Sequence, residues 1–273
     1  MKKIFVILAA AAAFSCAPRQ ELTIIHVNDT HSHLEPVRSG QFAGKGGSLE
    51  RAAYVDSVRR ADGADNVLLL HAGDFWQGTT YFSEFKGAVE VDVMNAMGYD
   101  AVTLGNHEFD NGLEALGEQI SRLRCPVVVC NYDFSPVVCG KYIKPYVIVE
   151  KAGKRIGIIG VLCNLKDMIS GDISNRIPEY DTVPTVQKYI DLLRPKCDLV
   201  IALTHIGYEP HNPGDLLDQD LAAATRGLDI IVGGHSHTYM DAPDMVKDLD
   251  GKEIPVIQVG WQGTSMGEFK VRF

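Results

Sequence analysis

The chain of 273 residues has no excess of basic residues, because its 26 lysines and arginines are outnumbered by 35 aspartates and glutamates. The formal net charge of −9 makes it a poor ligand for nucleic acid or for an anionic membrane surface, since both bind basic surfaces. Internal repeats and low-complexity linkers are absent, and 46% of the residues are hydrophobic against 22% charged. This composition excludes a disordered or collagen-like chain and is typical of a globular fold.

The sequence also lacks a hydrophobic run of the roughly 20 residues that cross a bilayer as a helix. The run that comes nearest is Ile4–Phe14, which follows two lysines and precedes Ser15 and Cys16. This pattern is typical of a bacterial secretory signal over residues 1–15. Cys16 stands where a lipoprotein signal carries its cysteine, so we expect a lipid on its sulfur as the only link to a membrane. The expected location is the periplasm or cell envelope, and a soluble secreted protein is the alternative.

The remaining cysteines lack the spacing of a disulfide framework or of a metal-binding knuckle. Their number is odd, so at least one stays unpaired within the chain. We interpret most of them as buried apolar residues, and an oxidising compartment would allow one disulfide whose pairing the sequence does not specify. They are Cys125, Cys130, Cys139, Cys163 and Cys197.

Short apolar runs alternate with segments of helical period, which indicates an α/β sandwich with buried sheet and helices outside. We expect one domain over 22–273, after a short tether over 16–21. In the first helix, Leu49, Ala52, Ala53 and Val55 are expected to face inward. The predicted strands cover 22–27, 67–70, 101–104, 127–130, 199–203, 228–232 and 255–259, with a hairpin over 146–161, and the predicted helices cover 48–60, 89–97, 113–123 and 184–195.

Polar residues directly follow five of these predicted strands, where open α/β sheets build their ligand sites. Seven such side chains are too many for one tetrahedral ion and suit two ions that share a carboxylate. Carboxylate, imidazole and amide ligands together favour Mn, Zn, Fe or Co over Ca or Mg. The candidate metal ligands are Asp29, His31, Asp74, Asn106, His205, His235 and His237.

Two such ions, about 3.5–4 Å apart, favour in-line displacement at phosphorus, with a bridging hydroxide as nucleophile. The leaving alkoxide then needs a proton donor. His107 adjoins a ligand without being required as one, so we predict that it is the general acid. Asp110, three residues later, is expected to orient the His107 ring and keep it protonated.

Five blocks in chain order carry a family resemblance. They are Asn28-Asp29-Thr30-His31, Gly73-Asp74, Gly105-Asn106-His107-Glu108-Phe109-Asp110, Thr204-His205 and Gly233-Gly234-His235-Ser236-His237. Together they resemble the calcineurin-like metallophosphoesterases, in particular the 5′-nucleotidase/UDP-sugar hydrolase branch, over about residues 22–273. The resemblance implies a four-layer α-β-β-α sandwich and hydrolysis of phosphate esters, with 5′-nucleotides or related nucleotide phosphates as expected substrates.

The resemblance also implies how the ligands are shared between the two ions. Asp29, His31 and His237 would hold one ion and Asn106, His205 and His235 the other, with Asp74 bridging both. It assigns His107 and Asp110 the catalytic pair already expected from the chemistry. Some nucleotidases carry Gln at the position of His237, which is a small departure.

A larger departure is that nucleotidases of this branch add a C-terminal domain that binds the nucleotide, whereas this sequence ends before it. We therefore expect a catalytic half that a separately encoded partner completes. Rival enzymatic functions are a cyclic-nucleotide phosphodiesterase and a sulfur-ester hydrolase of the same superfamily. A metal-loaded lipoprotein that binds without turnover is a rival of another class, but a binding site does not require the His107–Asp110 pair.

Several aromatic and histidine side chains leave two interpretations open. Trp76, Phe82, Phe85 and Trp261 either line the mouth of the site or pack within loops. His33 neighbours the metal loop but is expected to pack or to form hydrogen bonds rather than to coordinate. The remaining histidines, His26, His71 and His211, are expected in the core.

Overall fold

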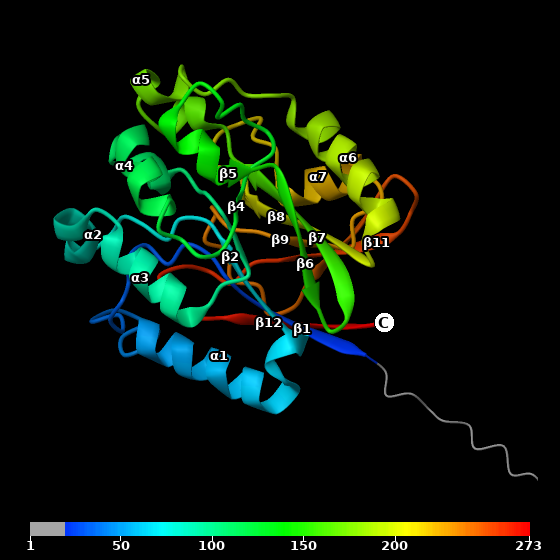
Figure 1. The fold of residues 1–273 in the computed structure, drawn as a ribbon, viewed down its shortest axis with the longest axis horizontal. Coiled ribbons are helices and arrows are strands. Elements are labelled where there is room, and N and C mark those ends of the chain that lie inside the picture. The colour runs from blue at the N-terminus through cyan, green and yellow to red at the C-terminus, as the bar shows by residue number, and fades with distance from the viewer. Residues whose placement is uncertain (1–19) are drawn as a thin grey trace, which may run out of the picture.

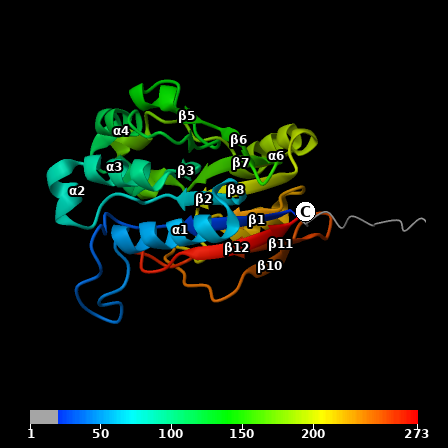
Figure 2. The same cartoon turned by 60° about the horizontal axis from the view of Figure 1, so that its bottom comes forward.

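The computed structural model describes residues 20–273, and the predicted signal segment and Cys16 lie outside the described residues. Within the described part, no helix has the length and apolar character needed to span a bilayer. Two six-stranded sheets form the centre of the molecule (Figures 1 and 2).

The first sheet has the strand order β12-β1-β2-β3-β4-β5. Its strands run parallel except for β12, which pairs antiparallel with β1 and so brings the end of the described chain beside its beginning. The bounds are β1 (Glu21–Val27), β2 (Val67–Ala72), β3 (Ala101–Thr103), β4 (Val127–Val128), β5 (Ile143–Lys144) and β12 (Gly267–Arg272).

The second sheet has the order β10-β11-β9-β8-β7-β6, with a parallel centre and an antiparallel strand at each edge. Its outer strand β6 forms the predicted hairpin with β7. The bounds are β6 (Tyr146–Lys151), β7 (Lys154–Leu162), β8 (Leu199–His205), β9 (Ile230–Val232), β10 (Asp244–Lys247) and β11 (Glu253–Ile257).

Alternate residues of the central strands pack in opposite directions, as the two-residue period of a strand requires. In β2, Leu68 and Leu70 pack between the sheets, whereas Val67 and Leu69 pack under the helices. Such a sheet, covered on both faces, consists of nearly continuous apolar residues, and every residue of β2 is buried.

Helices cover the outer face of each sheet, on opposite sides of the molecule (Figure 1). The first sheet carries α1 (Ser48–Asp62), α3 (Ala88–Met97) and α4 (Gly112–Ile120), with the short α2 (Thr80–Phe85) beside them. The second carries α6 (Thr182–Leu193) and α7 (Asp218–Ala224), while α5 (Gly171–Ser174) is a single turn. The four-layer α-β-β-α sandwich is therefore confirmed.

The inward face predicted for the first helix is wrong in part. Leu49 is 80% exposed and Ala53 is also exposed, whereas Arg51 is buried with Val55. The Arg51 guanidinium donates to two loop carbonyl oxygens, those of His33 at 3.2 Å and Gly263 at 3.4 Å. These hydrogen bonds stabilise a buried charge that would otherwise be costly. They hold Arg51 inward near the start of the helix, so the buried face there differs from the face that the apolar residues predict.

Other differences concern short elements. Strands β5 and β10 and helices α2, α5 and α7 were not predicted, and β4 covers half of the expected range. All five cysteines of the described chain are free thiols, so no disulfide is formed among them. Three of the five are buried, in agreement with the interpretation of most as apolar core residues.

Candidate active site

The seven predicted metal ligands lie together at one edge of the sandwich, although five different strands supply them. Strands β1, β2 and β3 of the first sheet and β8 and β9 of the second all lead into this edge. Asp29, Asp74 and His205 are at most 2% exposed. Among the candidates, the His237 side chain is the most open at 35% exposed, so it lies at the entrance.

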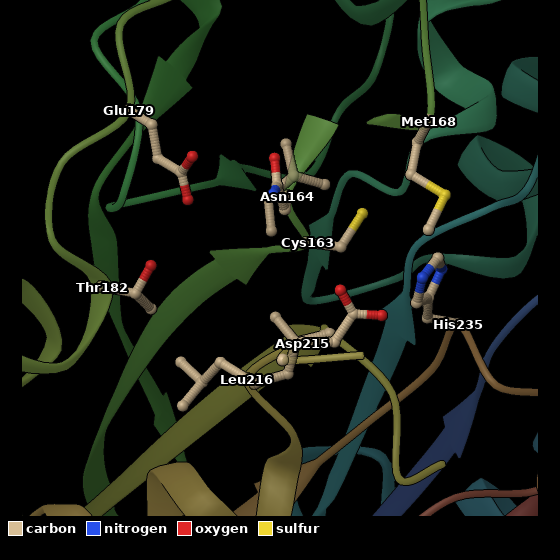
Figure 3. Close-up of a pocket in the computed structure, with 11 residues that line it drawn as sticks. Cys163, Asn164, Met168, Glu179, Thr182, Asp215, Leu216 and His235 are labelled. Carbon is tan, nitrogen blue, oxygen red and sulfur yellow. The ribbon is translucent and has the colours of Figure 1, made fainter. Parts of the chain in front are cut away.

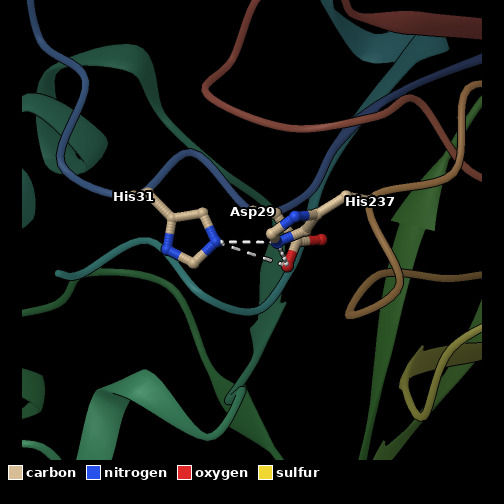
Figure 4. Close-up of side chains that lie close together, drawn as sticks. All are labelled: Asp29, His31 and His237. Atoms are coloured by element: carbon tan, nitrogen blue, oxygen red, sulfur yellow. Dashed lines mark hydrogen bonds and ion pairs between the residues drawn. The ribbon is translucent and has the colours of Figure 1, made fainter. Parts of the chain in front are cut away.

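One group of ligand atoms consists of Asp29, His31 and His237 (Figure 4). The Nε2 atoms of the two imidazoles lie 3.0 Å apart, and His237 Nε2 lies 3.3 Å from Asp29 Oδ1. The distance from His31 Nε2 to the same oxygen is 3.8 Å. Three donor atoms thus face one small volume.

A second group consists of Asp74, His205 and His235. His205 Nε2 lies 3.1 Å from Asp74 Oδ2, and the same carboxylate oxygen lies 4.0 Å from His31 Nε2 in the first group. Asp74 therefore stands between the two groups, as a shared ligand would. Asn106, 7% exposed, lies beside it, since the next residue's backbone N–H donates to Asp74 Oδ1 at 2.9 Å.

The donor set fits divalent cations. Asp29 Oδ1 and His205 Nε2 are buried without a hydrogen-bond partner among the described residues, which is costly unless a cation satisfies them. Burial alone would lower the pKa of His205, but the negative charges of Asp74 and Asp29 raise it to about 10. The buried site therefore favours positive charge at its centre. Buried carboxylates and imidazoles are ligands that first-row transition metals and zinc accept.

A backbone carbonyl fixes the orientation of His205. Its Nδ1 lies 2.6 Å from the carbonyl oxygen of Ala72, which can only accept, so Nδ1 carries the proton. Nε2 is then directed at the two aspartates, where a bound cation would take the place of its proton. Metal-binding histidines are commonly oriented by such a hydrogen bond from the second ring nitrogen.

The loops that carry the ligands have an unusual backbone. Positive φ angles occur at Asp29, His31, Asp74, His235 and His237, five of the seven candidates. Non-glycine residues rarely adopt this conformation, and it tends to occur at functional sites, where the surrounding structure compensates the strain.

Glycine is required beside these ligands for a second reason. A Cβ at Gly105 would overlap the Asp74 carboxylate and lie 2.6 Å from His205 Nε2. The predicted glycine blocks therefore allow the loops of the two sheets to approach each other closely.

The predicted catalytic pair is assembled beside the ligands. His107 Nδ1 lies 2.9 Å from Asp110 Oδ2, and the His107 ring centroid lies 5.3 Å from that of His31. Burial would lower the pKa of His107, but the hydrogen bond to Asp110 and the charge of Asp74 raise it to about 8. The ring is therefore predominantly protonated at pH 7. His107 also lies close enough to His31 and Asp74 for the three side chains to hold a metal ion together. Distance alone therefore does not distinguish a proton donor from a metal ligand at His107.

Glu108 is a buried residue of the site that the sequence interpretation missed. Its carboxylate accepts backbone N–H bonds from Asp74, Phe75, Trp76 and Gly105. It thereby joins the loop after β2 to the loop after β3. The signal in the sequence was its place inside the Gly105–Asp110 block, where an acid next to a catalytic residue is easily taken for a solvated charge.

The ambiguous aromatic residues are now placed. Trp76 and Phe82 are buried in the core, and Phe85 is 53% exposed on α2, so none of these three lines the ligand group. Trp261 does border the site, since its ring stacks on His237 with centroids 4.9 Å apart and an angle of 11°.

The four histidines outside the ligand set and the catalytic pair differ in their distance from the site and in burial. His26 and His71 are buried in the core, as predicted, and half-buried His33 bonds through Nδ1 to the His31 carbonyl oxygen at 2.8 Å. The core placement of His211 is wrong. It is exposed, and its ring lies 4.3 Å from that of His235, against which it packs.

A cavity of about 180 Å³ adjoins the second ligand group (Figure 3). Cys163 and the candidate ligand His235 form part of its wall, to which Glu179, Asp215 and Asn164 supply oxygen atoms. Within residues 20–273, no lysine or arginine lines it. The cavity therefore suits hydroxyl groups better than a phosphate.

The chain belongs to the calcineurin-like phosphoesterase family, whose model matches residues 22–239. This confirms the resemblance inferred from the five blocks, and it supports the expectation of a metal-dependent phosphoester hydrolase.

Individual relatives are 5′-nucleotidases. The chain is 34% identical to the 5′-nucleotidase of Rattus norvegicus over 93% of its own length and 46% of the relative's. The 5′-nucleotidase precursor of Thermus thermophilus has 35% identity and a TM-score of 0.82, covering 93% of this chain and 51% of that one. The NAD nucleotidase of Haemophilus influenzae has 31% identity and a TM-score of 0.81, covering 93% and 47%. The chain thus spans about half the length of the relatives it matches.

Proposed function

We propose that this protein hydrolyses nucleoside 5′-monophosphates or closely related nucleotide phosphates with two divalent metal ions. The observation that carries the proposal is the shared position of Asp74 between two groups of buried imidazole and carboxylate donors. The nucleotidase relatives support the nucleotide as substrate.

In this proposal, Asp29, His31 and His237 would hold one ion and Asn106, His205 and His235 the other, and Asp74 would contribute to both. Two bound ions would supply Lewis acidity towards the phosphoryl oxygens and neutralise their charge. The ligand types favour Mn, Zn, Fe or Co as the two ions.

The chain's own residues perform the proton transfer. His107 presents Nε2 towards the site while Nδ1 is held by Asp110, so the proton on Nε2 can pass to the departing alkoxide oxygen. Asp110 keeps the ring oriented and stabilises its charged form. A proton donor with its own orienting carboxylate favours turnover over a site that only binds.

The proposal includes the cellular setting expected from the sequence. We propose an extracytoplasmic enzyme, attached through a lipid on Cys16. A role in nucleotide breakdown outside the cytoplasm follows. Metabolic labelling with a fatty acid, compared between the full chain and Cys16→Ser, tests the anchor independently of activity.

Hydrolysis by residues 17–273 reloaded with Mn or Zn tests the activity, followed as phosphate release for the monoesters and as formation of nitrophenol or of 2′- or 3′-AMP for the diesters. The substrates are 5′-AMP, nitrophenyl phosphate, bis-nitrophenyl phosphate and 2′,3′-cyclic AMP, with Asp74→Asn as the inactive control. We expect metal-dependent release from 5′-AMP that the control lacks. Cleavage of the diesters alone would favour the phosphodiesterase alternative, and no turnover of any ester at two bound ions per chain would favour a binding role. Sulfur-ester substrates are assayed in parallel for the remaining alternative.

A further inference from the structure

A buried glutamine holds the segment that carries two of the candidate metal ligands. Gln258 follows the last residue of β11 and is 1% exposed. Its Oε1 accepts from the Thr238 backbone N–H at 2.6 Å and from the Ser236 hydroxyl at 3.1 Å. Its Nε2 donates to the Gly234 carbonyl oxygen at 2.8 Å. One side-chain amide thus contacts three points of segment 234–238.

The three contacted residues alternate with the two ligands of this segment. His235 belongs to the second ligand group and His237 to the first. Gln258 therefore holds each histidine through the residue before it and the residue after it. Both ligands have a positive φ angle, 84° at His235 and 57° at His237, and such a backbone persists only where the surrounding structure holds it in place. Gln258 supplies such contacts on both sides of both ligands.

The same end of β11 is also joined to Asp29. The Val259 backbone N–H donates to Asn28 Oδ1 at 3.0 Å. Asn28 Nδ2 donates to the Gly260 carbonyl oxygen at 2.6 Å and to Asp29 Oδ2 at 2.7 Å, and this carboxylate oxygen also accepts from the His235 backbone N–H at 2.9 Å. The segment directly after β11 therefore fixes ligands of the two groups relative to each other, although none of the seven candidate ligands belongs to it.

An amide is the side chain that suits the three partners of Gln258. An ionised carboxylate could accept from Thr238 and Ser236 but could not donate to the Gly234 carbonyl oxygen. The amide orientation is fixed as well, because exchanging Oε1 and Nε2 would place a donor against the Thr238 N–H and an acceptor against the Gly234 carbonyl oxygen. Since the amide is buried, water cannot take over a contact that is lost.

We propose that Gln258 is a positioning residue for both metal ions, because it sets the separation and direction of the His235 and His237 imidazoles at once. The inference rests on the two-ion site of the proposed function and deepens it. Gln258 acts through segment 234–238, which supplies one ligand to each group, so its loss weakens the binding of both ions together.

Gln258→Met tests the inference, since methionine keeps the length of the side chain but cannot donate and accepts only weakly. Gln187→Met is the matched control. Gln187 also forms three hydrogen bonds, to Asp191 and to the backbone of Arg226, but it lies on α6, on the outer face of the second sheet. The free energy of unfolding, measured in urea on the metal-free chain, should fall in both variants, so stability alone does not distinguish them.

Mn binding by calorimetry should distinguish them. We expect the wild-type chain to bind two Mn ions and Gln258→Met to bind both roughly 10- to 100-fold more weakly, as for other residues that orient metal ligands. Gln187→Met should bind Mn as wild type does. The visible absorption of bound Co(II), which depends on coordination geometry, should change in Gln258→Met and not in Gln187→Met. If Gln258→Met does not fold, Gln258→Asn takes its place, because the shorter amide cannot reach all three partners and the same two changes are expected.

Wild-type Mn affinity and an unaltered Co(II) spectrum in the folded Gln258 variant would overturn the inference, and so would weaker binding of one ion only. An equal loss of affinity in Gln187→Met would also overturn it, because the effect would then follow from lost stability. In each of these cases ester hydrolysis by the wild-type chain still upholds the proposed function. Weaker binding of both ions in Gln258→Met, beside a wild-type chain that binds two ions and cleaves no ester, would instead uphold the inference and overturn the proposed function.

Discussion

Asp74 is tied to Glu108 by a hydrogen bond in which the Asp74 backbone N–H donates to Glu108 Oε2 at 2.9 Å. The same buried carboxylate accepts from Gly105 at 2.6 Å, Phe75 at 2.9 Å and Trp76 at 3.1 Å. One side chain therefore holds the loop of the shared metal ligand against the loop that carries Asn106 and His107. Its distance from solvent makes each of these bonds hard to replace, because water cannot take over the donors.

Glu108→Gln tests this role. An amide nitrogen cannot accept a hydrogen bond, so at least one of the four backbone donors would lose its partner. We expect a loss of about 1–3 kcal/mol in the free energy of unfolding, measured in urea on the metal-free chain. Since residues that orient metal ligands affect affinity, Mn affinity by calorimetry should fall roughly 10- to 100-fold.

Glu114→Gln is the matched control, because that side chain is 72% exposed on α4. It should change neither the free energy of unfolding nor the Mn affinity. A Glu108→Gln chain with unaltered Mn affinity would show that the loops keep their arrangement without the carboxylate, even if stability fell.

The ligands were predictable because their side-chain types stand out where apolar strands end. Asp29, for example, lies two residues after the end of β1, and His205 is the last residue of β8. Parallel strands of one sheet end at one edge. Glycine at 73 and 105 marked the close approach of the loops. Such signals lie within a few residues of each other and need no knowledge of the tertiary fold.

Contacts between distant segments were not predictable in this way. Trp261 reaches His237 because β11 returns the chain to the ligand edge, and nothing local to Trp261 indicates this. Arg51 rather than Leu49 faces inward on α1, because the backbone carbonyl oxygens of Gly263 and His33 stabilise its charge. The edge strand β12 depends on pairing with β1, which lies at the opposite end of the described chain.

His107→Ala separates chemistry from metal binding. The general acid contributes typically about 10²- to 10⁴-fold, so kcat for an ester with a poor leaving group such as 5′-AMP should fall by that range. Nitrophenolate leaves without full protonation, so nitrophenyl phosphate should lose less. Asp110→Asn should cause a smaller loss, because the ring remains but its orientation and charge are less well supported. Metal content by elemental analysis should stay at the wild-type value in both variants, and a parallel loss of metal in His107→Ala would make His107 a ligand.

Asp74→Asn should remove metal-dependent stabilisation. Binding that is specific to the folded state adds about 2.7 kcal/mol at a metal concentration 100 times the dissociation constant. For a domain of this size that corresponds to roughly 5–10 °C in Tm. Wild-type protein with Mn should therefore melt higher than after chelation, whereas Asp74→Asn should melt at nearly the same temperature in both conditions. Asp92→Asn, with a side chain 66% exposed, should behave as wild type, and a full Mn shift in Asp74→Asn would exclude a shared ligand.

His26 predicts an acid-sensitive contribution to stability that is independent of the metals. Burial on β1 lowers its pKa to about 4, and its Nδ1 atom has no hydrogen-bond partner among the described residues. The unfolded chain takes up a proton on His26 below about pH 6.5, whereas the folded chain does not until about pH 4. Folded stability is therefore lost as the pH falls through this window, by about 2 kcal/mol between pH 7 and pH 5 from this group alone.

His26→Phe keeps a ring over Gly267, its cross-strand partner, but removes the titrating group. Free energies of unfolding in urea, measured in chelator at pH 7 and pH 5, isolate the effect, since the carboxylates titrate alike in both proteins and cancel in the difference. We expect the wild-type chain to lose about 2 kcal/mol more than His26→Phe over this interval. Identical pH dependence in the two proteins would mean that the folded chain accepts a proton at His26 as readily as the unfolded chain does, which its burial between β12 and the core opposes.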